Sequence, residues 1–459
     1  MNVNKLARSI LKGIGYTFAF VAPPLAAGFL LLMNANAALT APAAQSFTGT
    51  ALPAPAHDPS KPTVAIVASN NGTEITDLLA PYEVFAASEG FNVYVVAPQR
   101  EYTPFLWGGV DIMPHYSFAE LDQLLAGDPD VIVVPFIKDT ENPEIVQWIR
   151  DHAGENTQVV SICGGALVLA ATGLVDDGQV TTHQGVFPVL EKKYPHIQTV
   201  RGVRYTDNGN TITSAGITAG IDASLYTVQK LLGAEVALAT ARKLNYPYAH
   251  FLADPRYTPP AGSQAGLTVS ANATLLWRQS EIGVYLYEGV GEIDLTALLD
   301  TYGRTYTART VTFAEEREII RSRYGLYLIP RFDFAGVRGV ERIMAPGSRS
   351  SMSNAPALEE WAQAQQSLPV EYLYADGDTT TFAFDATLTD LARWRNGADA
   401  HSSATSLEYP AEHLQLAGKG WPLYRAFPAI AIGLLSVGLL FAIEKWWATR
   451  TRRAQMSAA

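Results

Sequence analysis

Residues 159–171 decide the fold of this chain: they read VVSICGGALVLAA and hold Cys163, the only cysteine among 459 residues. The stretch begins like the end of a buried strand and continues from Ala166 like an apolar helix. Small residues flank the sulfur on both sides, as in a nucleophile elbow, where a tight strand-to-helix turn exposes one side chain above the sheet. A thiol at a helix N-terminus has a lowered pKa and is more often the reactive thiolate. This composition favours a functional Cys163 over a buried, inert thiol.

Short β-branched runs alternate with helical segments upstream of this turn. Strands are predicted at 64–68, 93–97, 131–134 and 158–160, and helices at 77–88, 118–126 and 144–152. Continuous apolar strands that alternate with helices indicate an α/β fold with a parallel sheet covered on both faces. In such a sheet the site lies at the carboxyl ends of the strands, which is where Cys163 falls.

Two further motifs follow the cysteine along the chain. Residues 180–183, VTTH, place His183 on a predicted strand, where it could lie alongside the sulfur as a base or as a partner for the thiolate. Residues 212–222, ITSAGITAGID, then lead into a helix that ends near Gly233. Together with the stretch around Cys163, these motifs resemble the ThiJ/PfpI family, in particular the amidotransferase-like domain of AraC-type regulators. The resemblance covers roughly residues 62–247 and implies a flavodoxin-like α/β sandwich.

Asp77 is the acidic residue that the resemblance implies beside the cysteine, because residues 75–81, ITDLLAP, resemble the family segment that supplies one. Such an acid could hold a proton against the thiolate or act as a general acid–base for a bound carbonyl. Asp77 equally fits a helix N-cap. His183 equally fits a satisfied polar residue at a strand end.

The chain departs from the family at several positions around the site. Gly164 follows the cysteine in this chain. At the same position the PfpI-type peptidases carry His and the isonitrile hydratases carry Thr. Gln184 stands where AraC-type regulators usually carry Trp. Phe136 follows Pro135 where many relatives have Pro-Gly-Gly, which donates an oxyanion N–H. With no His-x-Glu in the sequence either, peptidase, isonitrile hydratase and glutamine amidotransferase activities are all disfavoured.

Two functions stay open on this basis. One is a cysteine-dependent hydrolase or lyase of small carbonyl or amide substrates, in which Cys163 is the nucleophile, His183 the base or the orienting residue, Asp77 the acid and the Gly164 N–H an oxyanion donor. The other is a non-catalytic ligand or redox sensor, or an assembly module, that keeps the elbow as a pocket. The departures favour the second function, because a fold does not fix an activity.

The sequence also repeats itself at an offset between 211 and 217 residues. The matching landmarks are 77–78 with 294–295, 109–118 with 325–334, and 133–135 with 344–346. Ordered landmarks at a nearly constant offset indicate duplication. This register places Tyr374 where Cys163 stands, so we expect a degenerate, cysteine-free second lobe at 278–400. The two lobes would form an intrachain pseudo-dimer in place of the family's usual homodimer.

Charge and sequence pattern argue against nucleic acid as a partner for this chain. A loop-rich stretch at about 248–270 lies where an AraC-type DNA-binding domain would begin, and no helix-turn-helix pattern follows it. A net charge of −11 gives no electrostatic footprint for a polyanion. The sequence has no His/Cys cluster with metal spacing, no phosphate-cradling loop and no cofactor box, so no metal or cofactor is predicted. The small-molecule ligand cannot be identified from the sequence.

Both ends of the chain indicate a membrane. Residues 13–33 carry no charge and precede Ala35-Asn36-Ala37, which fits a signal peptide or an uncleaved anchor. Residues 426–443 are also uncharged and are followed by Lys445, Arg450, Arg452 and Arg453. The positive-inside rule then predicts a cytoplasmic C-terminus and extracytoplasmic lobes. A lone Cys163 in that oxidising compartment cannot form an intrachain disulfide.

The predicted organisation has eight parts. They are a signal anchor or signal peptide at 1–38, a linker at 39–61, the cysteine-bearing domain at 62–250, a linker at 251–277, the degenerate lobe at 278–400, a juxtamembrane segment at 401–425, a transmembrane helix at 426–446 and a basic cytoplasmic tail at 447–459.

Overall fold

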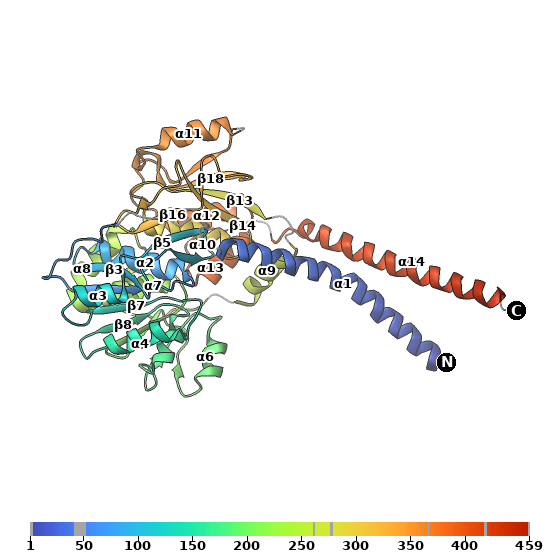
Figure 1. Ribbon diagram of the computed structural model, residues 1–459, viewed down its shortest axis with the longest axis horizontal. Coiled ribbons are helices and arrows are strands. Elements are labelled where there is room, and N and C mark those ends of the chain that lie inside the picture. The colour runs from blue at the N-terminus through green and yellow to red at the C-terminus, as the bar shows by residue number, and fades with distance from the viewer. Residues whose placement is uncertain are drawn as a thin grey trace.

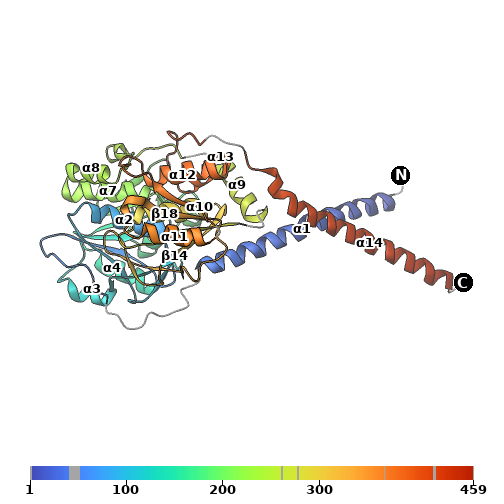
Figure 2. The ribbon, with the colours of Figure 1, turned by 90° about the horizontal axis from the view of Figure 1, so that it is seen from above.

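The computed structural model describes residues 3–40, 52–259, 262–275, 279–365, 367–416 and 420–457. These residues form two lobes and two long helices. The helices, α1 (Val3–Thr40) and α14 (Phe427–Ser457), cross each other and run away from the lobes toward the two termini (Figures 1 and 2). Over Ser9–Asn34 and Leu423–Met456 the described chain is long and apolar enough to cross a membrane.

A seven-stranded sheet forms the centre of the first lobe. Its neighbouring strands are parallel except for the antiparallel pair β11–β12 at one edge. In order across the sheet they are β11 (Tyr205–Asp207), β12 (Thr211–Ser214), β8 (Gln158–Ser161), β7 (Val131–Val134), β1 (Thr63–Val67), β3 (Asn92–Ala97) and β6 (Tyr116–Ser117). The predicted α/β fold with a parallel sheet is confirmed.

Helices cover both faces of this sheet. One face carries α3 (Phe118–Leu124), α4 (Pro143–His152), α5 (Gly165–Thr172) and α6 (Phe187–Lys193). The other carries α2 (Ile75–Ala87), α7 (Ala219–Leu232) and α8 (Ala234–Lys243). Side chains alternate along each strand, so Ala65 and Val67 contact the first core whereas Val64 and Ile66 contact the second. A short pair, β9 (Gln179–Val180) with β10 (Gln198–Thr199), and the 3-10 turn η1 (Ala249–Leu252) complete this lobe.

The second lobe is built on a parallel sheet of five strands. Their order is β17 (Phe332–Asp333), β14 (Ala308–Ala314), β13 (Ser280–Tyr285), β18 (Arg342–Ser348) and β19 (Val370–Tyr374). Its helices are α10 (Glu292–Gly303), α11 (Ala355–Ala364), α12 (Ala383–Trp394) and α13 (Gly397–Ser406), with short 3-10 turns η2 (Arg349–Ser351) and η3 (Leu423–Ala426).

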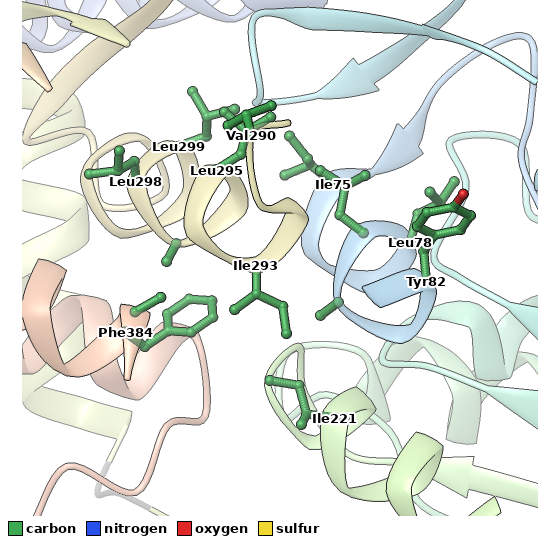
Figure 3. Packing of buried hydrophobic residues seen from close by; sticks show 14 of the residues in the cluster. Ile75, Leu78, Tyr82, Ile221, Val290, Ile293, Leu295, Leu298, Leu299 and Phe384 are labelled. Carbon is green, nitrogen blue, oxygen red and sulfur yellow. The ribbon is translucent and has the colours of Figure 1, made fainter. Parts of the chain in front are cut away.

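The two lobes share a sheet and a core. The shared sheet runs β15 (Ile320–Arg321), β16 (Tyr327–Pro330), β5 (Val110–Met113), β4 (Thr103–Leu106) and β2 (Thr73–Glu74), and β16 of the second lobe pairs antiparallel with β5 of the first. Beside it, α2 packs against α10, and Ile75 lies on the side of α2 that faces Val290 and Leu295 (Figure 3). One continuous apolar core therefore spans both lobes.

The structure differs from the sequence-based boundaries in three places. The expected linker at 251–277 contains a helix, α9 (Gly262–Leu275), which packs against α1 and α13. The expected juxtamembrane segment at 401–425 includes the end of α13 and buried residues as far as Leu416, so the second lobe extends beyond residue 400. The expected strand at 180–183 ends at Val180. Within the linker expected at 39–61, residues 41–51 lie outside the described part of the chain.

Candidate functional site

Cys163 sits in a sharp turn between β8 and α5. Its φ is +54°, a left-handed value that is strained for any residue but glycine and that clusters at functional sites. The flanking glycines are required by close packing: a Cβ on Gly165 would lie 2.0 Å from the Val134 carbonyl oxygen, and a Cβ on Gly164 would lie 2.5 Å from the Phe136 ring. The chain therefore forms the strand–turn–helix geometry that the sequence predicts.

The thiol itself is buried, with 6% of the residue exposed. Burial raises the pKa of the Cys163 thiol well above its ordinary value, and the neighbouring Asp77 carboxylate raises it further. A hydrogen bond from the Ile217 backbone N–H opposes this rise. Desolvation thus outweighs the helix N-terminus, and the lowered pKa expected from the sequence is not found.

Asp77 lies in the first turn of α2, and Glu74 is the residue that caps this helix: its carboxylate accepts the Asp77 N–H at 2.6 Å. One Asp77 oxygen, Oδ2, accepts the Phe136 N–H at 3.1 Å. The other, Oδ1, is buried and has no hydrogen-bond partner within the described chain. Burial raises the pKa of Asp77 to about 7. The N-cap alternative for Asp77 is therefore wrong, and the Phe136 amide is already used by a carboxylate.

His183 is engaged on both ring nitrogens by groups other than the thiol. Gly185 donates its N–H to Nδ1 at 3.1 Å, so Nε2 carries the proton and donates to the Ser406 carbonyl oxygen at 3.0 Å. Burial lowers the pKa of His183. No hydrogen bond between His183 and Cys163 occurs among the described residues. The Gly164 N–H likewise makes no hydrogen bond in the described chain and remains available as a donor.

The second lobe contributes Arg304, a residue that no sequence motif singles out. It follows α10 directly, and its guanidinium bonds the carboxylates of Glu74 and Asp300, the latter at 3.2 Å. Its positive charge partly offsets the rise in pKa that burial causes at both Cys163 and Asp77. The site is thus a compact group of opposite charges drawn from both lobes.

Glu408 is the second contribution from that lobe. It follows α13, and its carboxylate is 2% exposed beside His183, with Oε1 3.9 Å from Nε2. The two carboxylate oxygens accept backbone N–H groups from Gln184 and Gly216, each at 2.6 Å, and the Tyr257 hydroxyl at 3.0 Å. Both motifs that follow the cysteine are therefore bonded to the second lobe, through Gln184 beside the 180–183 motif and Gly216 within the 212–222 motif.

Comparison with known proteins places this site in a family. Residues 62–230 match the DJ-1/PfpI family. The isonitrile hydratase of Pseudomonas putida is 32% identical over 175 residues, which are 37% of this chain and 72% of that enzyme. The chain belongs to the DJ-1/PfpI family, which confirms the resemblance drawn from the motifs.

The chain is also similar to a regulator and to solved structures. The HTH-type transcriptional regulator CdhR of Pseudomonas aeruginosa is 30% identical over 128 residues, which are 28% of this chain and 38% of the regulator. Among solved structures, a ThiJ/PfpI family protein from Pseudomonas syringae aligns with a TM-score of 0.39 at 22% identity, covering 50% of this chain and 96% of that one. Schizosaccharomyces pombe DJ-1 aligns with a TM-score of 0.35 at 18% identity, covering 40% of this chain and 100% of that one.

Proposed function

We propose that this protein is a membrane-anchored DJ-1/PfpI member that senses a small ligand or an oxidant at Cys163, or assembles with a partner, without turning over a substrate. The observation that carries this proposal is the engagement of the groups that catalysis needs. His183 bonds Ser406 and Gly185, and the Phe136 amide bonds Asp77. A nucleophilic thiol needs a base and preorganised oxyanion donors. Here Cys163 has a raised pKa, and within the described part of the chain no base is hydrogen-bonded to it.

Alkylation of Cys163 tests this proposal directly, because the full-length chain contains a single thiol. We expect the rate with iodoacetamide to keep rising above about pH 9, since the unperturbed thiol pKa is about 8.5 and burial raises it. Cys163→Ala supplies the background rate. A rate that already levels off near about pH 7 would mean a thiolate at neutral pH and would favour an enzyme.

A cysteine-dependent hydrolase or lyase of small carbonyl or amide compounds is the alternative, and Asp77 is the observation that favours it. Its pKa of about 7 and its unpaired Oδ1 suit a group that takes a proton from the thiol. The likeness to an isonitrile hydratase points the same way, although Gly164 follows the cysteine here. A metabolite screen with Cys163→Ala as the control decides between the two functions.

We also propose that the second lobe is a degenerate copy of the first. In its support, the strand order β17-β14-β13-β18-β19 matches β6-β3-β1-β7-β8 of the first sheet. At the 216-residue offset of residues 109–118 and 325–334, Asp111 of β5 corresponds to Tyr327 of β16 and Met113 to Ile329. These residues pair crosswise in the shared sheet: Asp111 with Ile329 and Met113 with Tyr327. Such reciprocal pairing of equivalent residues is the mark of a twofold, isologous interface.

The packing of α2 on α10 supports the same proposal. The Thr76 hydroxyl donates to the Asp300 carboxylate, and the Ile293 backbone N–H donates to the Glu83 carboxylate at 2.5 Å. At the 217-residue offset, Thr76 corresponds to Ile293 and Glu83 to Asp300. Equivalent residue pairs are therefore bonded in both directions, through the Thr76 hydroxyl in one pair and the Ile293 backbone N–H in the other, as expected for two related halves.

Membrane topology forms the last part of the proposal: both termini are cytoplasmic and the lobes extracytoplasmic. In its support, α1 and α14 lie together, with Lys12 Nζ 2.9 Å from Glu444 Oε2, and both termini lie at the far end of the pair (Figure 2). The cationic residues that follow the second span favour a cytoplasmic C-terminus.

Protease added to intact spheroplasts is expected to digest the lobes and leave a protected C-terminal fragment. This follows because extracytoplasmic lobes are reachable while the cytoplasmic tail is not. Permeabilised spheroplasts serve as the control and should lose the fragment. Protected lobes with a cleaved C-terminal tag would reverse the orientation.

A further inference from the structure

The loop between β12 and α7 is hydrogen-bonded to the second lobe on both sides of Ile217. On one side the Gly216 N–H donates to Glu408 Oε2 at 2.6 Å. On the other, Thr218 donates to the Leu407 carbonyl oxygen through its backbone N–H at 3.2 Å and its hydroxyl at 3.0 Å. Ile217 itself has a φ of +24°, which is strained for a β-branched residue. Such a conformation persists only where its surroundings hold it.

Ile217 matters because its backbone N–H acts on the Cys163 thiol. It forms the hydrogen bond to the Cys163 sulfur that opposes the effect of burial on the thiol. Hydrogen bonds to a charged group favour the charged form, so this contact stabilises the thiolate. The residues that hold Ile217 in place therefore act on Cys163 without touching it.

Burial and hydrogen bonds keep the Glu408 side chain in the orientation that bonds this loop. It is 2% exposed, has a φ of +49°, and is bonded by the Gln184 N–H and the Tyr257 hydroxyl as well as by Gly216. Gly216 allows the approach, because a Cβ there would lie 2.5 Å from the Glu408 carboxyl carbon. A buried carboxylate with three donors is fixed in one orientation.

The helix α13, which ends two residues before Glu408, is itself rigidly attached. Asn396 caps α13 by accepting the Asp399 N–H at 2.9 Å, and Asp399 forms a buried ion pair with Arg425 at 2.9 Å. The Ser403 hydroxyl donates to the Thr301 carbonyl oxygen at 2.8 Å. A residue directly after such a supported helix can position another group accurately.

We propose that Glu408 is a positioning residue of the Cys163 site, fixing residues 216–218 so that the Ile217 N–H is directed at the sulfur. The second lobe thereby sets the reactivity of the thiol in the first. This inference rests on the proposed function, in which Cys163 is the group that meets the ligand or oxidant.

Glu408→Ala in the full-length protein tests the proposal. At a fixed pH of about 8, we expect Cys163 to react with iodoacetamide about three- to ten-fold more slowly, because loss of a hydrogen bond to the thiolate lowers its population while its nucleophilicity rises only in part. Glu412→Ala, which removes an exposed carboxylate four residues further on, should leave the rate unchanged. Thermal melting and gel filtration establish that the variants are folded.

The sign of the effect separates positioning from support of the fold. Loosened packing would expose the thiol and speed alkylation, so an equal or faster rate in folded Glu408→Ala overturns the proposal. Acetate should restore the rate in this variant by binding where the carboxylate was, whereas chloride at the same ionic strength should not; failure of both also overturns it. If Glu408→Ala does not fold, Glu408→Gln keeps the shape but opposes an amide N–H₂ to one of the backbone donors, and must still slow the reaction.

These outcomes are distinct from those that test the sensor proposal. A wild-type thiol with a depressed pKa would remove the sensor proposal. The ratio of variant to wild-type rates would still report whether Glu408 positions Ile217.

Discussion

Replacing Arg204 by methionine is expected to lower the free energy of unfolding by about 3–5 kcal/mol, the range for breaking a buried ion pair by removing one partner. The Arg204 side chain is fully buried, and its Nε lies 2.6 Å from Asp222 Oδ2. The guanidinium also donates to the Glu408 carbonyl oxygen at 2.5 Å and to the Thr218 hydroxyl at 3.2 Å. Without Arg204, the Asp222 carboxylate would be left buried beside only the Tyr246 hydroxyl.

Denaturant unfolding of the detergent-solubilised protein measures this loss. Arg256→Met is the matched control, because Arg256 pairs with Asp254 while 80% exposed to solvent, and exposed pairs contribute little. Combining Arg204→Met with Asp222→Asn should recover part of the stability, since the amide removes the unpaired charge. Equal losses in Arg204→Met and Arg256→Met would show that the buried pair has no special weight.

Asp77→Asn is expected to stabilise the protein at alkaline pH and to flatten the dependence of its stability on pH. Burial raises the pKa of Asp77 from 3.8 to about 7. The folded state therefore holds its proton more tightly than the unfolded state. The resulting stability is fully present below about pH 4 and is lost as the pH rises through about 7.

The size of this loss is up to about 4 kcal/mol, at 1.36 kcal/mol for each pKa unit. Asparagine has no charge to desolvate, and its amide oxygen can still accept the Phe136 N–H. We therefore expect Asp77→Asn to melt above the wild type at pH 8 and close to it at pH 4. Asp139→Asn, at an exposed carboxylate, should melt at the wild-type temperature at both pH values. Parallel curves for Asp77→Asn and wild type would contradict the raised pKa.

Local sequence pattern was enough to predict the elbow and the sheet around it. The β-branched strands, the paired glycines after Cys163 and the helix after them act over a few residues, and the structure has β7, β8 and α5 where the pattern places them. The predicted direction of the shift in the Cys163 pKa was wrong. The effect of a helix N-terminus can be inferred from local sequence, whereas the depth to which the thiol is buried cannot.

Arg304 and Glu408 could not be predicted, because their roles depend on contacts across more than 190 residues of sequence. Neither lies in a motif, and Glu408 falls in residues 401–425, which the sequence pattern predicts to be a juxtamembrane segment. The helix α9 was missed for a related reason. Its two glycines and several polar residues give it a weak helix propensity, and packing against α1 and α13 supplies what propensity does not.

The sheet that draws strands from both lobes determines which fragments of this chain can be prepared. A truncation that ends before the second lobe would leave β5 without β16, as an open edge ready to pair with another chain. It would also leave the apolar face of α2 without α10 (Figure 3). Recombinant work on the family domain should therefore start from both lobes together, with only α1 and α14 removed.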